Sequence, residues 1–212
     1  MYKKAVTADI AYLQDALKSG APAKNAVRTI KGVAMQLAAY GEATGDAALT
    51  AQAVKVAEAM GKKDYAGAEE AAKGLSSPKA GAKPKGPLHT VAKLSLDDVM
   101  SSYRPSKNGG MNMEADIRAA VKSGTIDAKT AELIGVRTAV IADYTTHFPN
   151  EKATTNKDLQ AQWDKWSKEM GELGKQLADE AGKPKPDLKA VVGVVKKLDA
   201  NCVNCHNKFR DD

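Results

Sequence analysis

The sequence predicts an all-α protein. Its 212 residues are 43% apolar but only 5% aromatic, and Ala, Lys, Leu and Val are abundant, which favours helices. Apolar residues also recur at alternating spacings of four and three in the long segments, as they do on one face of a helix. We therefore predict two tandem helical bundles, at residues 1–76 and 111–212, joined by a linker and connecting segment at residues 77–110.

The linker prediction rests on the stretch "SPKAGAKPKGP", whose Pro, Gly and Lys residues cannot bury a core. Much of the net charge of +6 lies here, because residues 77–110 hold six basic and two acidic residues, whereas residues 111–212 hold sixteen of each. Nucleic-acid binding usually needs a basic stripe with aromatic residues between the charges. The sequence shows no such stripe, so we expect no nucleic-acid partner.

The two halves share short sequence blocks in the same order. "ADI", "ALKSG" and "AVRT" of the first half return as "ADI", "AVKSG" and "GVRT" in the second. This order predicts an internal duplication, in which each half is a short helix followed by three longer ones. Arg28 then corresponds to Arg137, and we interpret Arg28 as a solvated helix residue. The first half has no cysteine, so any chemistry that requires cysteine is confined to the second copy.

Four helices are expected in the second half, at residues 113–122, 128–148, 156–181 and from about Pro186 onward. Pro149 ends the second of them because proline cannot continue a helix. The third carries a narrow apolar seam of Leu159, Trp163, Trp166, Met170, Leu173 and Leu177. The inner face of the fourth is predicted to be Leu188, Val191, Val192, Val195, Leu198, Cys202, Cys205 and Phe209.

The last helix ends in Cys202-Val-Asn-Cys205-His206, which is the C-x-x-C-H attachment motif of a c-type haem. Two thiols three residues apart can form thioethers to the two vinyl groups of one porphyrin, and the adjacent imidazole can bind the iron. A thioredoxin-like C-x-x-C would lie at a helix N-terminus instead. A zinc site would need a fourth ligand, for which only His89 and His147 are available.

The motif and its surroundings resemble the class II c-type cytochromes, the cytochrome c-prime family. The resemblance is carried by "CHNKFR" at the end of the chain and by "GVRTAVIADYTTHF", which is similar to the distal helix of that family. It covers about half of the chain, and in the family the arginine-bearing helix comes first of four. It implies that Arg137 approaches a haem propionate, that Ile141 covers the open iron face, and that Arg210 lies beside the proximal imidazole.

The sixth ligand of the iron is left open by the sequence. Coverage by Ile141 would leave a five-coordinate iron that binds a small diatomic gas, whereas a protein ligand would make the haem a dedicated electron carrier. The candidate ligands are His89, His147, Met100, Met111, Met113 and Met170. Among these we place His89 ahead of the methionines, and we expect His147 to have a surface or interhelix role.

We expect a monohaem c-type cytochrome with one covalent haem c, which transfers electrons or holds a gas and catalyses no reaction. The alternative is a haem enzyme, such as a peroxidase or an oxidoreductase acting on a small nitrogen compound. The expected partners are redox proteins or a small diatomic gas, and the sequence leaves open whether the protein forms a homodimer. No apolar run is long enough to span a membrane. Because thioethers to haem form outside the cytoplasm, we expect a periplasmic or otherwise exported protein whose leader is absent from this sequence.

Overall fold

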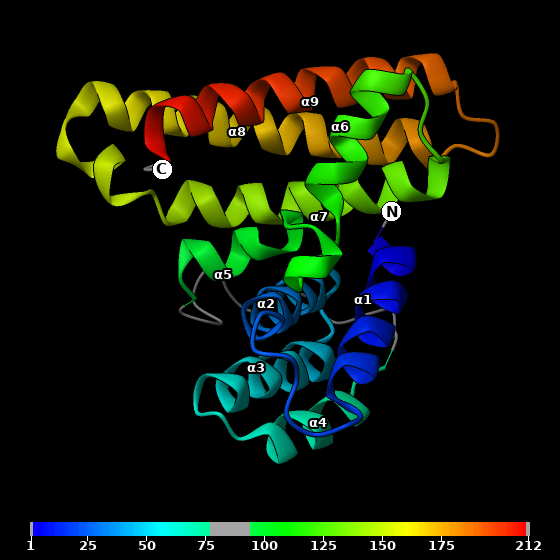
Figure 1. The fold of residues 1–212 in the computed structure, drawn as a ribbon, viewed down its shortest axis with the longest axis vertical. Coiled ribbons are helices and arrows are strands. Elements are labelled where there is room, and N and C mark those ends of the chain that lie inside the picture. Colours follow the sequence, from blue (N-terminus) through cyan, green and yellow to red (C-terminus); the bar gives the residue numbers. More distant parts are fainter. Residues whose placement is uncertain (1, 77–93, 211–212) are drawn as a thin grey trace. The chain divides into compact units, whose positions relative to one another are not determined.

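The computed structural model describes residues 2–76 and 94–210. All regular secondary structure in these ranges is helical, which confirms the all-α class (Figure 1). The helices fall into two compact units, one of residues 2–113 and one of residues 114–212, which we describe separately.

The first unit is built on four successive α-helices, α1 (Tyr2–Leu17), α2 (Val27–Thr44), α3 (Ala47–Gly61) and α4 (Tyr65–Lys73). Each contacts the next along the chain, and α1 also contacts α4, so the four helices close on themselves. The largest fully buried side chains of this core are Leu13, Leu17, Ile30, Leu37, Tyr40 and Met60. The expected order of one short helix and three longer ones is wrong here, because the 16-residue α1 is long and the 9-residue α4 is short.

The tight connection between α2 and α3 follows from two adjacent residues. Gly45 has a φ of 69°, a left-handed conformation that ends α2 at little cost for a glycine. The side chain of Asp46 then accepts hydrogen bonds from the backbone N–H groups of Ala48 and Leu49, which start α3. The chain therefore reverses within two residues, and α2 and α3 pack along their lengths.

Residues 94–113 belong with the first unit, whereas we had assigned residues 77–110 to a linker and connecting segment and residues 111–113 to the second bundle. They form α5 (Leu96–Met100) and the 3-10 helices η2 (Ser101–Tyr103) and η3 (Ser106–Asn108), and both α5 and η2 pack on α2. A Cβ at Gly32 of α2 would clash with a backbone carbonyl of α5, so the two backbones touch. Residues 77–93, the Pro/Gly/Lys-rich part, lie outside the described ranges.

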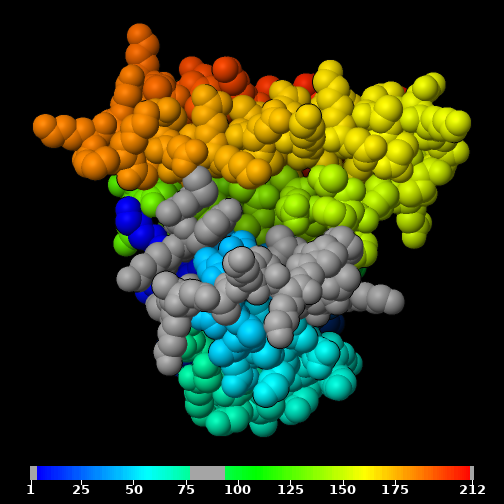
Figure 2. All heavy atoms as spheres, turned by 180° about the vertical axis from the view of Figure 1, so that it is seen from behind, coloured from blue at the N-terminus to red at the C-terminus, as the bar shows by residue number. Residues whose placement is uncertain are grey.

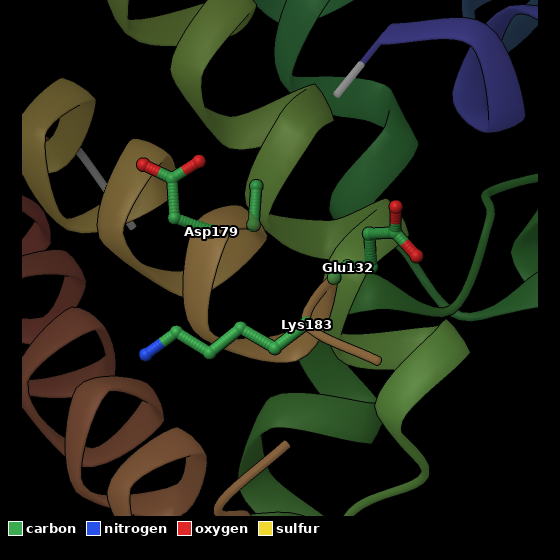
Figure 3. Close-up of a pocket in the computed structure, with 5 residues that line it drawn as sticks. Glu132, Asp179 and Lys183 are labelled. Atoms are coloured by element: carbon green, nitrogen blue, oxygen red, sulfur yellow. The ribbon is translucent and has the colours of Figure 1, made fainter. Parts of the chain in front are cut away.

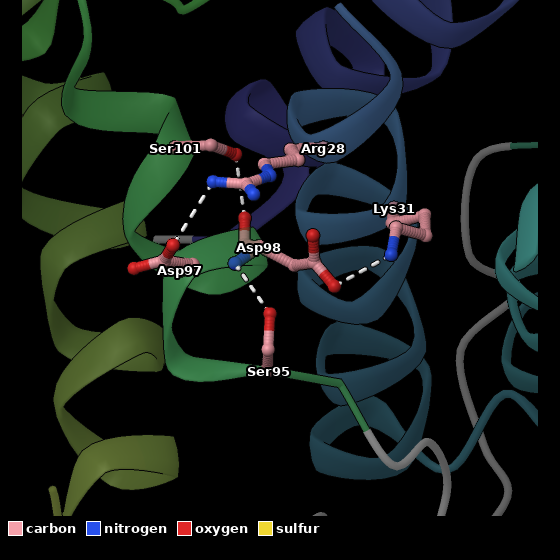
Figure 4. Close-up of polar contacts among 6 residues, drawn as sticks. All are labelled: Arg28, Lys31, Ser95, Asp97, Asp98 and Ser101. Carbon is pink, nitrogen blue, oxygen red and sulfur yellow. Dashed lines mark hydrogen bonds and ion pairs between the residues drawn. The ribbon is translucent and has the colours of Figure 1, made fainter.

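Two ion pairs link α2 to α5 (Figure 4). The Lys31 ammonium lies 2.6 Å from the Asp98 carboxylate, and both side chains are largely buried. The Arg28 guanidinium lies 2.9 Å from Asp97, and both of these side chains are at least half exposed. Arg28 is thus an exposed residue, as expected, although it is paired with Asp97. The exposed Arg28–Asp97 pair adds little stability, whereas loss of one partner of the Lys31–Asp98 pair would leave a largely buried charge unpaired.

The second unit contains α6 (Met113–Ser123), α7 (Ala128–His147), the 3-10 helix η4 (Glu151–Thr155), α8 (Lys157–Ala181) and α9 (Leu188–Phe209). These bounds confirm the four predicted helices to within a few residues. Asp127 and Asn156 accept hydrogen bonds from the first turns of α7 and α8, and α7 ends just before Pro149.

Helices α7 and α8 cross at very short distance because glycines face each other. A Cβ at Gly135 of α7 would lie 2.5 Å from the backbone N of Ala178, and one at Gly174 of α8 would lie 2.7 Å from the N of Ala139. The opposite face of α8 is exposed, as its yellow to orange residues show in Figure 2. This backbone contact makes the α7–α8 pair the most extensively packed part of the unit.

The inner face of α9 agrees with the sequence prediction except at its start. Val191, Val192, Val195, Leu198 and Phe209 are buried and the two cysteines are half-buried. The prediction is wrong for Leu188, because 47% of its surface is exposed. It is the first residue of the helix, directly after the capping Asp187.

Candidate functional site

The last turns of α9 bring four of the predicted site residues together. Cys202, Cys205 and His206 are spaced by three and four residues inside a continuous α-helix, which places them on neighbouring positions of one helix side. Arg210 follows one turn after His206 and caps the helix. Both thiols are free and half-buried, whereas His206 is exposed. The motif therefore presents two free thiols and one imidazole from one rigid element.

Asn201 fixes the rotation of α9 directly before the motif. Its side chain is buried, and Nδ2 donates to the backbone carbonyl of Trp166 at 3.3 Å and to Oε2 of Glu169 at 3.1 Å, both on α8. Five residues along an α-helix correspond to a net rotation of about 140° around the helix axis. Because Asn201 is held against α8, the His206 position therefore faces away from α8. Sequence reasoning missed Asn201, although a polar residue beside an apolar seam is a recognisable signal.

Phe209 fixes α9 on the other side of the motif. Its ring meets the rings of Trp163 and Trp166 edge to face, with centroids 5.2 Å and 5.8 Å apart. Trp163 is itself held, because its indole N–H donates to the carbonyl of Thr145 at 2.8 Å. Asn150 donates to the carbonyl of Phe209 at 3.4 Å. The C-x-x-C-H turn is therefore held at both ends, by Asn201 and by Phe209.

The electrostatic surroundings of the motif keep its groups neutral. Burial raises the pKa of the Cys202 thiol to about 12, with smaller contributions from Asp199, Cys205 and Glu114. Burial also raises the pKa of Cys205 to about 11. For His206, burial first and then the Arg210 charge lower the pKa, so the imidazole tends to be neutral, which is the form that binds a metal.

Helix α6 supplies a charged pair that sequence reasoning also missed. The carboxylate of Glu114 and the guanidinium of Arg118 lie 2.6 Å apart, one turn from each other on α6. Glu114 acts electrostatically on both Cys202 and His206, and Arg118 acts on His206. Both side chains lie beside the buried residues Met113, Ile117 and Ala120 of the same helix. Nothing in the local sequence indicates this proximity, because it depends on how α6 packs.

Arg137 and Ile141 lie on α7, one turn apart, and both are buried. Helix α7 contacts α9 over a much shorter stretch than it contacts α8. The structure thus places both residues inside the haem-motif unit, and their contact with a haem remains a proposal from the resemblance.

The candidate sixth ligands are spread over the chain. His147 is exposed at the end of α7, with Nδ1 2.9 Å from the carbonyl O of Asp143 in the preceding turn. Met113 and Met170 are buried, Met100, Met111 and Met113 belong to the first unit, and His89 lies outside the described residues. None of these positions identifies a sixth ligand.

The donor set of the motif fits a covalently bound haem. The two thiols are unpaired with each other and lie in an environment apolar enough to raise their pKa, which suits a porphyrin edge. The imidazole lies at the adjacent position on the same helix, and its lowered pKa favours the neutral form that binds a metal. In the ranges that the structure describes, no group of three or more His, Cys, Asp or Glu side chains is placed to hold a metal ion.

A polar pocket lies elsewhere in the second unit, between the start of α7 and the end of α8 (Figure 3). It is lined by Glu132, Ala178, Asp179, Gly182 and Lys183. It contains no residue of the C-x-x-C-H turn and none of the candidate iron ligands.

Comparisons with protein-family models, with curated proteins and with solved structures found no match for this chain. No helix of residues 2–76 or 94–210 has the length and apolar character needed to cross a membrane.

Proposed function

We propose that the protein is a monohaem c-type cytochrome that carries one electron or holds a small diatomic gas. The observation that carries the proposal is the position of Cys202, Cys205 and His206 on one side of the continuous helix α9, with both thiols free. This arrangement matches what covalent haem attachment requires of a protein.

Each site residue has a defined part in the proposal. Cys202 and Cys205 would hold the haem covalently, because each S–H group would add across one vinyl group, with the sulfur bonded to one vinyl carbon and the hydrogen to the other. His206 would bind the haem iron, with Arg210 beside the imidazole, and the resemblance would place Arg137 at a propionate and Ile141 over the open side of the iron. The haem supplies the one-electron iron couple. Asn201 and Phe209 hold the attachment turn in place.

We further propose that the two units arose by duplication and that only the second holds haem. Four α-helices in succession form the body of each unit, which supports this idea. Because haem thioethers form outside the cytoplasm, the proposal also implies a periplasmic or otherwise exported protein.

Intact mass spectrometry of the purified protein tests covalent attachment. The mass is expected to exceed that of the polypeptide by one haem, and this increment should resist acid and solvent extraction. The Cys202→Ala/Cys205→Ala variant is the control, and it should lose the covalent increment. A wild-type protein that shows no increment when produced with haem-attachment machinery would refute the proposed function.

The spectrum of the reduced holoprotein tests whether the iron is open. With Ile141 over the iron, we expect a broad visible band that shifts when carbon monoxide is added, because an aliphatic side chain cannot coordinate iron. Sharp, split bands that do not shift when carbon monoxide is added would show that a protein side chain coordinates the iron instead. His89→Ala and His147→Ala would then identify it, since the variant that becomes high-spin has lost the ligand.

A further inference from the structure

The outer face of α9 is rich in lysine. Four exposed lysines, Lys189, Lys196, Lys197 and Lys208, lie within a stripe about 140° wide when the helix is viewed along its axis. Between them lie the exposed residues Gly193, Ala200, Val203, Asn204 and Asn207. We call these nine residues the lysine face. It contains no carboxylate, because Asp187 caps the start of α9 and the half-buried Asp199 lies beyond the edge of the stripe.

The charges of the lysine face are available for a partner. Within the described ranges, none of its four lysines takes part in an ion pair or a side-chain hydrogen bond. Lys183 of the same unit, by contrast, is paired with Glu180 at 2.6 Å. Unpaired charges of one sign create a field that attracts a molecule of opposite charge over roughly a Debye length, about 8–10 Å at moderate salt.

The lysine face also carries an exposed apolar residue. Val203 is 44% exposed, and among the described residues only it and Leu188 are large apolar side chains with such exposure. Val203 lies between the two cysteines in the chain, about 60° around the helix from His206. An apolar residue among charges is the usual composition of a protein docking patch, in which the apolar part is desolvated and the charges steer the approach.

From these observations we propose that the lysine face is the docking surface for an acidic electron-transfer protein. This inference rests on the proposed function, because it assumes that the adjacent turn holds a haem. Docking here would bring the partner to the helix that carries the iron ligand, and one electron would pass between the partner's redox centre and the haem iron. The charge and the exposed Val203 favour a protein partner over the bare anionic surface of a membrane.

The test measures electron transfer from the ferrous holoprotein to oxidised plastocyanin, an acidic blue-copper protein, by stopped flow. The test variant reverses three charges, Lys196→Glu/Lys197→Glu/Lys208→Glu. The matched control reverses three exposed lysines on the outer face of α8, Lys165→Glu/Lys168→Glu/Lys175→Glu, and so has the same net charge. Mass, spectrum and reduction potential are recorded for all three proteins, because only proteins with equal driving force can be compared.

We expect the second-order rate constant of wild type to fall as ionic strength rises. At low ionic strength the α9 variant should be at least about tenfold slower than wild type, with little dependence on salt, whereas the α8 control should lose about twofold or less. Equal losses in both variants would mean that only net charge matters, and no loss in either would mean that the partner docks elsewhere. Either result overturns the docking surface.

Two further outcomes are distinguishable. Binding of wild type but not of the α9 variant to phosphatidylserine vesicles, with equal rates toward plastocyanin, would assign the face to a membrane and overturn the proposal. A wild-type protein without covalent haem would fail the mass measurement, and the proposed function and the docking surface would then fall together. If the protein holds haem but its rate of electron transfer does not depend on the α9 lysines, the docking surface alone is overturned.

Discussion

Asn201 is the residue on which the orientation of the C-x-x-C-H turn depends most directly. Replacing it with alanine leaves the Trp166 carbonyl and the Glu169 carboxylate without this donor, and we expect a loss of about 1–3 kcal/mol in the free energy of unfolding. Asn204→Ala, at an exposed position of the same turn, should change it by less than about 0.5 kcal/mol. Urea denaturation followed by circular dichroism measures both, and equal effects would refute the anchoring role of Asn201.

The two thiols give the haem-free protein a characteristic dependence on pH. The pKa values of Cys202 and Cys205 are raised from 9.0 to about 12 and about 11, so folding keeps both protonated where the unfolded chain ionises. The unfolded state therefore binds fewer protons above pH 9, and stability must fall as pH rises from 9 to about 12. Below pH 9 the thiols contribute no such change, because they are neutral in both states.

Urea denaturation of haem-free protein across this alkaline range measures the effect. The loss of stability should be smaller in Cys202→Ala/Cys205→Ala, which retains all other titrating groups. Alkylation by iodoacetamide provides a second readout, in which Cys205 should react faster than Cys202 and both should react much faster once the chain is unfolded. A pH dependence identical in wild type and variant would contradict the buried state of the thiols.

At the scale of elements, the α7–α8 crossing is the contact most sensitive to added volume. A methyl group at Gly174 would meet the backbone N of Ala139 at 2.7 Å and the carbonyl O of Gly135 at 2.9 Å. Backbone atoms of packed helices cannot move aside singly, so we expect Gly174→Ala to lose about 1–3 kcal/mol of stability. Gly193→Ala on α9 is the matched control, because its Cβ would meet nothing within 4 Å.

The control variant, Gly193→Ala, should change the free energy of unfolding in the opposite direction. Alanine in place of an exposed helical glycine reduces the entropy of the unfolded chain, and a gain of about 0.5–1 kcal/mol is expected. Chemical denaturation of the two variants measures both signs in one experiment. A Gly174→Ala protein as stable as wild type would show that the two backbones are farther apart than 2.7 Å contacts require.

Helix bounds could be predicted from sequence where local signals decide them. Pro149 was the signal for the end of α7, and the structure adds Asp127 and Asn156 as caps that act on the adjacent first turns of α7 and α8. Helix α5 was missed because it depends on contacts far away in the chain, such as the Lys31–Asp98 pair, and the sequence between 94 and 110 has too few apolar residues to show a periodicity.

The residues of the candidate site also fall into two groups, those that could be predicted from local sequence and those that depend on packing. Cys202, Cys205 and His206 could be found from spacing alone, since they occupy one turn of one helix. Asn201 and the Glu114–Arg118 pair could not, because their roles arise from the packing of α8 and α6 around that turn. Leu188 shows the opposite error, in which an apolar periodicity continued beyond the part of the helix that is buried.

At the scale of the whole molecule, the division into two units predicts that two probes will report different unfolding transitions. Both tryptophans of the chain, Trp163 and Trp166, belong to the unit of residues 114–212, so fluorescence follows that unit alone. Circular dichroism follows the helices of both units. In haem-free Cys202→Ala/Cys205→Ala protein, where no haem quenches the indoles, the two urea curves should therefore differ.

Substitutions in each unit should then move one probe selectively. Asp98→Ala removes the partner of the largely buried Lys31 in the first unit, and it should shift the circular dichroism curve while leaving the fluorescence midpoint unchanged. Gly174→Ala should shift the fluorescence midpoint, because the α7–α8 contact lies in the tryptophan-containing unit. If the protein holds a covalent haem, as we propose, the haem should raise the unfolding transition of residues 114–212, because a group that favours the folded state stabilises it, and haem absorbance of the wild type would follow that transition. If fluorescence and circular dichroism instead coincide and move together in every variant, the chain unfolds as one cooperative body, and the two compact units are not separate units of stability.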